Sequence, residues 1–147
     1  MRKLGFKVLA PAMIIFFGIC AYRCSCPCYL EQTFKNLTDV RIQTNSLIAS
    51  SNDSIKNHLA EIQETEKIIN SAINQNNGRK GCKEIGKIWS HFKNDSTGVY
   101  DMFISDWKKN KVLPIVYTKS ITEDINKILD QIEAGEDAIK EKKKPCK

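Results

Sequence analysis

Residues 29–75 contain neither glycine nor proline, and this uninterrupted stretch constrains the fold more than any other feature of the chain. Its apolar residues recur at steps of three, four and seven, which is the spacing of one helical face. The stripe shifts register between Ile48 and Ile55, where the residues are helix-capping types. We therefore expect either one kinked helix or two helices, at about 29–49 and 53–75.

The middle of the chain predicts two further helices. The run Asn76-Asn77-Gly78 is typical of a helix end with glycine as a left-handed cap. Apolar residues at helical spacing indicate a third helix over about 81–93 and a short fourth helix over about 99–107. Residues 111–117 form the only strand-like run, and Pro114 favours an extended connector there.

The last part of the chain predicts a long amphipathic helix. Ser120 and Glu123 form a capping box that predicts where this helix begins. Its apolar stripe consists of Ile121, Ile125, Ile128, Ile132 and Ile139. No stripe in the chain has the two-residue period of a strand. The expected fold is therefore all-α, an elongated helical bundle or coiled-coil-like hairpin of four to five helices.

The N-terminus has the pattern of a secretory signal. Arg2, Lys3 and Lys7 precede an uncharged run over residues 8–22. This run is shorter than the roughly 20 apolar residues that a membrane-spanning helix needs. We therefore expect residues 1–21 to be a signal peptide cleaved after Ala21, with an uncleaved single anchor as the alternative. Either way, residues 22–147 are predicted to form a single helical domain outside the cytoplasm.

The cysteines agree with an oxidising compartment. Removing the signal leaves five, an odd number, so one thiol is free, modified or paired between chains, as in a disulfide-linked homodimer. The five candidates for disulfide bonding are Cys24, Cys26, Cys28, Cys82 and Cys146. We expect Cys82 and Cys146 to be oxidised, either to each other or to members of the cluster formed by the other three.

Three asparagines stand in N-glycosylation sequons, namely Asn36, Asn52 and Asn94. The asparagine, serine and threonine content of the chain would give about 1.3 such tripeptides by chance. The excess is mild, and it favours a eukaryotic secretory protein.

Charge is divided unevenly along the chain. The net charge of +6 falls to +3 if the three basic residues of the signal are removed. Residues 78–119 carry nine basic and four acidic side chains, whereas residues 120–139 carry one basic and six acidic. We expect these two segments to complement each other inside one bundle. An exported chain without a nucleic-acid-binding module is not predicted to bind nucleic acid.

Residues that could perform chemistry are sparse. No nucleophile, zinc or phosphate-binding motif occurs, and His58 and His91 stand alone. We therefore predict no catalytic residues, no metal and no cofactor. Aromatic residues gather between residues 89 and 107, where they suit the broad end of a core. The alternative is that Trp89, Tyr100 and Trp107 are exposed and contact a partner, because such residues dominate binding hot spots.

Two functions remain, and both depend on protein contact. With its signal segment, sequons, cysteines and amphipathic helices, the chain resembles helical cytokines in plan, which implies a secreted ligand for a protein receptor. With residues 1–22 uncleaved, the long helical stretch 29–75, Cys82 and Cys146, it resembles the inner-membrane spanin subunits of phages in plan. That resemblance implies a membrane-anchored extracytoplasmic coiled coil. Only in that case is a membrane an expected partner.

Overall fold

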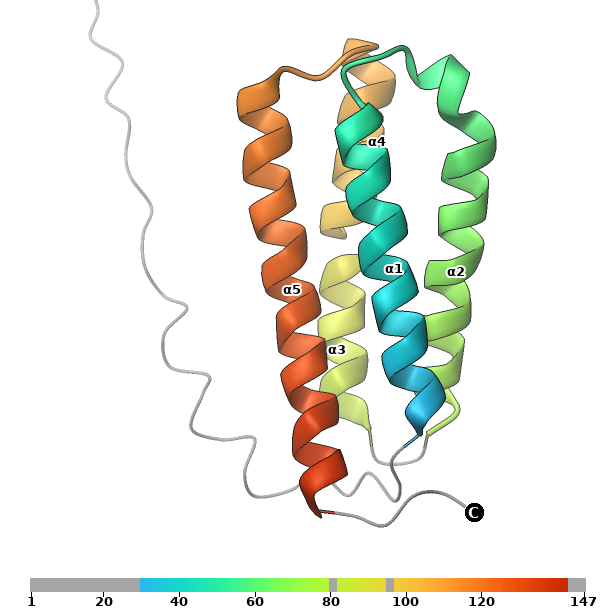
Figure 1. Cartoon of the computed structure of the whole chain (residues 1–147), viewed down its shortest axis with the longest axis vertical. Coiled ribbons are helices and arrows are strands. Elements are labelled where there is room, and N and C mark those ends of the chain that lie inside the picture. The colour runs from blue at the N-terminus through green and yellow to red at the C-terminus, as the bar shows by residue number, and fades with distance from the viewer. Residues whose placement is uncertain (1–29, 80–81, 95–96, 143–147) are drawn as a thin grey trace, which may run out of the picture.

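A computed structural model describes residues 30–79, 82–94 and 97–142, which form helices joined by short connections (Figure 1). The elements are α1 (Glu31–Ser50), the short 3-10 helix η2 (Ile55–His58), α2 (Leu59–Asn77), α3 (Lys83–Phe92), α4 (Val99–Asn110) and α5 (Ile115–Lys142). No strand occurs within these described ranges. The predicted all-α fold is confirmed, and the stretch 29–75 contains two helices rather than one kinked helix.

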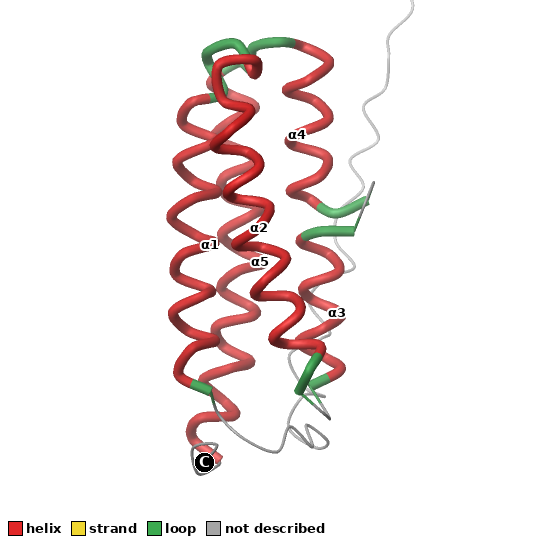
Figure 2. The backbone as a smooth tube through the Cα atoms, turned by 90° about the vertical axis from the view of Figure 1, so that its right-hand side faces the viewer, coloured by secondary structure: helices red, strands yellow, loops and turns green. Residues whose placement is uncertain are grey.

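The five α-helices make four rods. α3 and α4 follow each other along one rod, which lies behind α1, α2 and α5 in the first view and to their right in the second (Figures 1 and 2). Successive rods run in opposite directions, which is the up-down-up-down arrangement of four-helix bundles with short loops. We call the end with the loops at 51–54 and 111–114 the tip, and the end where α2 ends and α3 begins the base.

A row of aromatic rings fills the core along α3 and α4. Neighbouring ring centroids lie 5.7–6.4 Å apart from Trp89 to Trp107, and the His58 ring follows 5.5 Å beyond. The members of the row are Trp89, Phe92, Tyr100, Phe103, Trp107 and His58. The row continues across the break between the two helices, so ring packing helps to keep α3 and α4 in line.

Asp101 connects the first turn of α4 to the two residues that follow α3. Its carboxylate accepts hydrogen bonds from Lys93 Nζ and from the backbone N–H of Asn94, both at 2.8 Å. Gly98 lies so close to the preceding turn that a Cβ atom would come within 2.5 Å of the Asn94 nitrogen. Only glycine therefore fits at this position without moving the backbone.

The start of α5 differs from the prediction. The helix begins at Ile115, directly after Pro114, so the expected connector over 111–117 and the expected capping box are both wrong. The Pro114 carbonyl accepts hydrogen bonds from the backbone N–H groups of Tyr117 and Thr118, at 2.9 and 3.1 Å. A proline can begin a helix because its missing N–H would have no partner there. Tertiary contacts hold this turn, since the Tyr117 hydroxyl donates to the Asp106 carboxylate at 2.6 Å.

Two further details differ from the sequence analysis. Gly78 ends α2 with φ −69°, so it is not a left-handed cap, and the Arg79 N–H tightens the turn by bonding to the Asn76 carbonyl. In α5 Leu129 is fully buried, whereas the neighbouring Ile128, which the sequence places in the stripe, is only partly buried beside the core. The 3.6-residue period brings Ile125, Leu129 and Ile132 onto one line, and Ile128 falls at its edge.

Candidate functional site

The aromatic residues predicted as partner contacts lie in the core. Trp89, Tyr100 and Trp107 are at most 1% exposed. Trp107 Nε1 donates to the Asp53 carbonyl at 3.0 Å, and burial raises the pKa of Tyr100 far above its ordinary value. Helical spacing places all three on the single inward face of their rod. This corrects the alternative that they are exposed to contact a partner, and it agrees with the prediction that they pack in the core.

The three sequon asparagines have different surroundings. Asn52 in the loop at the tip and Asn94 after α3 are both exposed. Asn36 lies within α1, where it is partly buried and its amide donates to Gln75 Oε1 on α2 at 2.7 Å. An attached glycan requires a freely accessible amide nitrogen, so the structure favours Asn52 and Asn94 over Asn36 as acceptors.

Cys82 is buried and is disulfide-bonded. It is the only cysteine within the described ranges, so its pairing remains a prediction. The other four candidates, Cys24, Cys26, Cys28 and Cys146, lie outside the described residues, as does the predicted signal peptide over residues 1–21. Cys82 stands directly before α3, at the base of the bundle.

The base contains a buried ion pair. Arg79 Nη1 donates to Glu136 Oε1 at 2.5 Å, and the two side chains are 4% and 0% exposed. This pair joins the basic central segment to the acidic last helix, as the charge distribution predicts. On the outside of the bundle, Arg41 of α1 makes a second connection to α5 by bonding to Asp130 and Glu133 at 2.7 and 2.8 Å. These charged groups therefore hold helices together.

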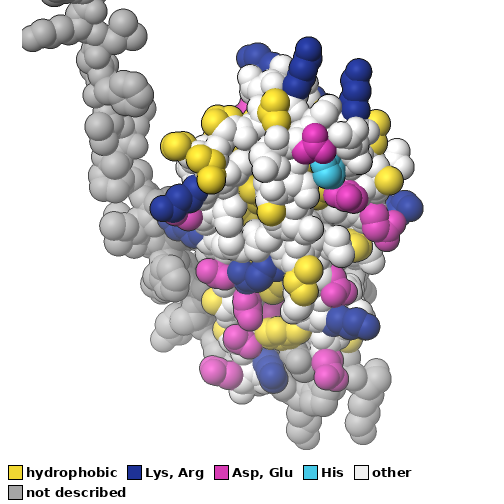
Figure 3. All heavy atoms as spheres, turned by 45° about the horizontal axis from the view of Figure 1, so that its top comes forward, with side chains coloured by type: hydrophobic (Ala, Val, Ile, Leu, Met, Phe, Trp, Pro, Cys, Tyr) yellow, Lys and Arg dark blue, Asp and Glu magenta, His cyan; other side chains and the backbone are white. Residues whose placement is uncertain are grey.

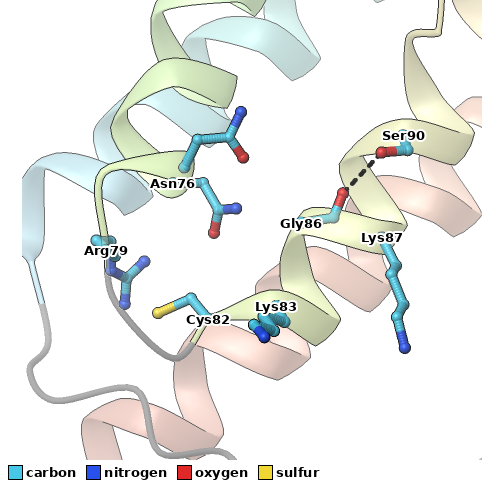
Figure 4. A pocket seen from close by; sticks show the side chains of 8 residues that line it. Asn76, Arg79, Cys82, Lys83, Gly86, Lys87 and Ser90 are labelled. Carbon is cyan, nitrogen blue, oxygen red and sulfur yellow. Dashed lines mark hydrogen bonds between the residues drawn. The ribbon is translucent and has the colours of Figure 1, made fainter.

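An open pocket of about 370 Å³ lies beside this pair, between the end of α2 and the start of α3 (Figure 4). Asn76 is 2% exposed there, and its Oδ1 atom has no hydrogen-bond partner among the described residues. The Ser90 hydroxyl donates to the Gly86 carbonyl at 3.1 Å. The lining residues are Asn76, Asn77, Arg79, Cys82, Lys83, Gly86, Lys87 and Ser90. This set contains no histidine or carboxylate that could serve as a base for Ser90.

His58 is held between two carboxylates at the tip. Its Nδ1 lies 3.0 Å from Glu61 Oε2 and its Nε2 lies 3.3 Å from Asp53 Oδ2. The bond to Glu61 is the main reason why the pKa of His58 is raised above 6.5. The carboxylates lie on opposite nitrogens, so the three groups do not converge on one ion. Across the described ranges, no three His, Cys, Asp or Glu side chains are placed to hold a metal.

Exposed aliphatic and basic side chains gather at the end of α4 and the start of α5. Val112, Ile115 and Val116 are 47%, 82% and 79% exposed. Four exposed lysines surround them in the sequence, and we call the seven residues together the tip surface. The lysines are Lys108, Lys109, Lys111 and Lys119. Figure 3 looks toward this end of the bundle and shows hydrophobic and basic side chains interspersed on it.

A second surface lies on the side of the bundle. Thr38, Ile42, Ser46 and Ala49 follow one another at steps of three and four on the exposed face of α1, and we call them the α1 face. None of them is charged, and Ile42 is 59% exposed. This surface was not predicted from the sequence, because it contains none of the aromatic residues that are typical of binding hot spots. The signal was the missing charge on the polar side of the helix.

The described helices include none that is both long and apolar enough to cross a membrane. Comparison of the chain with protein-family models, with curated proteins and with solved structures finds no match.

Proposed function

We propose that this protein is a secreted, non-enzymatic helical protein that acts through contact with a protein partner. The observation that supports this proposal best is the α1 face. It gives about three turns of exposed helix face without a charged side chain, in a chain of which 27% is charged. The centres of protein interfaces are depleted in charged residues, and a helix face is a common recognition surface with anchors at three- and four-residue steps.

Ile42 is the natural anchor of this surface. It is a large aliphatic side chain that is 59% exposed, and it lies between the small residues Thr38 and Ser46 on the same face. Small neighbours let a partner approach the helix closely around a single protruding side chain. Behind the face, α1 packs against both α2 and α5, so the surface is held rigidly and little order must be gained on binding.

The resemblance to helical cytokines extends to a four-rod bundle with exposed helix faces. The connections differ, because growth-hormone-type bundles run up-up-down-down with long crossovers, whereas this chain alternates in direction with short loops. The proposal of a secreted contact protein therefore rests on the surface, and the cytokine plan serves only as an architectural comparison.

The test is a binding experiment on cells of the organism that makes the protein. A photo-crosslinking residue is placed at Ser46 of the exported protein, and labelling is competed with unlabelled protein. We expect a saturable product that wild-type protein and the control Gln63→Asp compete away. Gln63 is exposed on α2, so this control adds the same negative charge on a different helix. Ile42→Asp should compete at least tenfold less well, as expected for losing an anchor side chain. Equal competition by the two variants would contradict the proposal.

The alternative function is a membrane-anchored extracytoplasmic envelope protein, spanin-like in plan. It is favoured if residues 1–21 are retained, since the described chain begins and ends at the base and would extend away from an anchor there. N-terminal sequencing of the exported protein separates the two functions. A start near Tyr22 supports the secreted protein, and an intact Met1 supports the anchored one.

The proposed export implies covalent modification. We expect glycans on Asn52 and Asn94, which are exposed, and none on Asn36, whose amide is bonded to Gln75. We also expect disulfide bonds that use Cys82 and Cys146. Non-reducing peptide mass spectrometry of the exported protein reads both features. A glycan on Asn36 alone, or a free thiol on Cys146, would contradict this part of the proposal.

A further inference from the structure

The tip surface exposes aliphatic side chains that the core does not need. Leu113 closes the core beneath it, being 4% exposed, and its N–H bonds to the Ser51 carbonyl at 2.8 Å. Ile115 and Val116 follow in the first turn of α5, beyond Pro114, and point outward with about four fifths of their surface in water. Two adjacent β-branched aliphatic residues at a helix start serve no packing purpose here.

The charge of this surface has one sign. Between Trp107 and Thr122 the sequence carries Lys108, Lys109, Lys111 and Lys119 and no acidic residue. Within the described ranges, none of these lysines forms a salt bridge, whereas Lys67, Lys87 and Lys93 are each paired with a carboxylate. Asp106, which directly precedes Trp107, accepts a hydrogen bond from the Tyr117 hydroxyl. Four exposed lysines without a described ion pair therefore flank the exposed aliphatic pair in the sequence.

We propose that the tip surface docks onto an anionic lipid bilayer. Ile115 and Val116 enter the boundary between headgroups and acyl chains, while the lysines contact lipid phosphates and carboxylates. Exposed aliphatic area combined with basic side chains is what binds proteins to anionic membrane surfaces. This inference uses a different surface from the α1 face, so it stands or falls separately from the proposed function.

The composition of the tip surface favours lipid over a protein partner. Protein hot spots are enriched in tryptophan, tyrosine and arginine, and protein interfaces are depleted in lysine. The exposed large apolar residues of the described chain include no aromatic residue. Both described arginines, Arg41 and Arg79, are engaged in ion pairs. The tip surface offers lysine and branched aliphatic residues instead, a combination suited to a fluid, negatively charged layer.

The experiment is vesicle co-sedimentation of the exported protein. Vesicles of pure phosphatidylcholine are compared with vesicles in which about a third of the lipid is phosphatidylserine. We expect binding only to the anionic vesicles, and less of it as salt is added. Any binding by residues outside the described ranges is common to all variants, so the ratio of partition coefficients between variants is the readout.

Two variants separate the parts of the surface. Lys109→Gln/Lys111→Gln should lower the partition coefficient about tenfold to thirtyfold, given the attraction of each lysine to an anionic surface. Ile115→Ser/Val116→Ser should lower it at least severalfold without changing the circular dichroism spectrum. The matched control Lys35→Gln/Lys127→Gln, which removes two exposed lysines elsewhere, should stay within twofold of wild type.

Three results would overturn the proposal. The first is equal binding to neutral and anionic vesicles. The second is equal loss of binding in the control and the tip variants, which would indicate a general charge effect. The third is a loss of vesicle binding in Lys109→Gln/Lys111→Gln but not in Ile115→Ser/Val116→Ser, together with binding to heparin that is as tight as binding to the vesicles. That result would assign the lysines to a soluble polyanion.

Discussion

The two ends of the bundle place opposite kinds of side chain in unfavourable surroundings. At the base, the charged pair of Arg79 and Glu136 is buried, with exposures of 4% and 0%. At the tip, Ile115 and Val116 are 82% and 79% exposed. A buried pair constrains how helices meet, because removing either partner leaves a charge in the interior. An exposed aliphatic pair constrains nothing in the fold. The buried pair at the base therefore constrains the fold, whereas the exposed pair at the tip is available for the proposed docking.

The largest expected effect is at the base. Arg79→Met leaves the Glu136 carboxylate buried without its ion-pair partner and should lower the free energy of unfolding by about 3–5 kcal/mol. Urea unfolding followed by circular dichroism measures this. As a comparison, Lys87→Met removes the exposed ion-pair partner of Glu84 and should change the free energy of unfolding by less than about 1 kcal/mol.

The double variant Arg79→Met/Glu136→Leu sharpens this test. Replacing both charges by apolar groups should recover most of the loss, since no unpaired charge remains. If the double variant is as unstable as Arg79→Met alone, the buried pair is not the cause, and the contrast between the two ends loses its physical basis.

At the tip, a substitution should stabilise the protein. Lys111 ends α4 with φ 67° and ψ −39°, the only described non-glycine residue with positive φ. Such a conformation is costly for a residue with a Cβ atom and free for glycine. Lys111→Gly should therefore raise the free energy of unfolding by about 0.5–1 kcal/mol. Lys109→Gly, inside the helix, should lower it by about 1 kcal/mol. Loss of stability in both variants would show that the turn at Lys111 is unstrained.

The stability of the tip end should depend on pH through His58. Its pKa is raised, mainly by the hydrogen bond to Glu61, so the charged form is favoured by folding. This contribution is fully present below the unfolded value of 6.5 and is lost as the pH rises through the folded pKa. The urea concentration at the midpoint of wild-type unfolding should decrease as the pH is raised from about 5.5 to 8.5. His58→Gln should remove this slope, and His91→Gln, at an exposed site, should retain it.

The smallest expected effect is at the exposed aliphatic pair. Val116→Ser should change the free energy of unfolding by less than about 0.5 kcal/mol, as is usual for surface positions. The neighbouring Leu113→Ala, at a site that is 4% exposed, should cost about 2 kcal/mol or more. A large loss in Val116→Ser would show that the tip surface is part of the folding core and would end the contrast with the base.

The helices were predictable because each carries a local signal. The glycine-free stretch, the stripe of Ile125 and Ile132, and the stop at Gly78 can all be recognised from spacing within a few turns. The start of α5 could not be found in this way. Its first turn depends on the Leu113 bond to Ser51 and on the Tyr117 bond to Asp106, which join separate parts of the chain.

The candidate surfaces were harder to predict than the fold. The charge distribution predicts that two segments complement each other. It does not predict that Arg79 and Glu136 form the pair, because these residues lie 57 positions apart in the sequence. The exposure of Ile115 and Val116 was also not predictable. Their strand-like run suggests burial, whereas their exposure in the structure depends on the loop beneath them. The aromatic residues show the opposite case. Tryptophan and tyrosine are typical of binding surfaces, but Trp89, Tyr100 and Trp107 pack in the core of this protein.

The arrangement of the chain ends has a practical consequence for handling the molecule. α1 begins at the base and α5 ends there (Figure 1). A rod of 20 residues, such as α1, separates that end from the tip by about 30 Å. A reporter protein, a surface tether or an affinity tag joined directly to the start of α1 or to the end of α5 would therefore orient every molecule the same way, with the tip directed outward. Sensor surfaces prepared in this manner would present one uniform layer of tips.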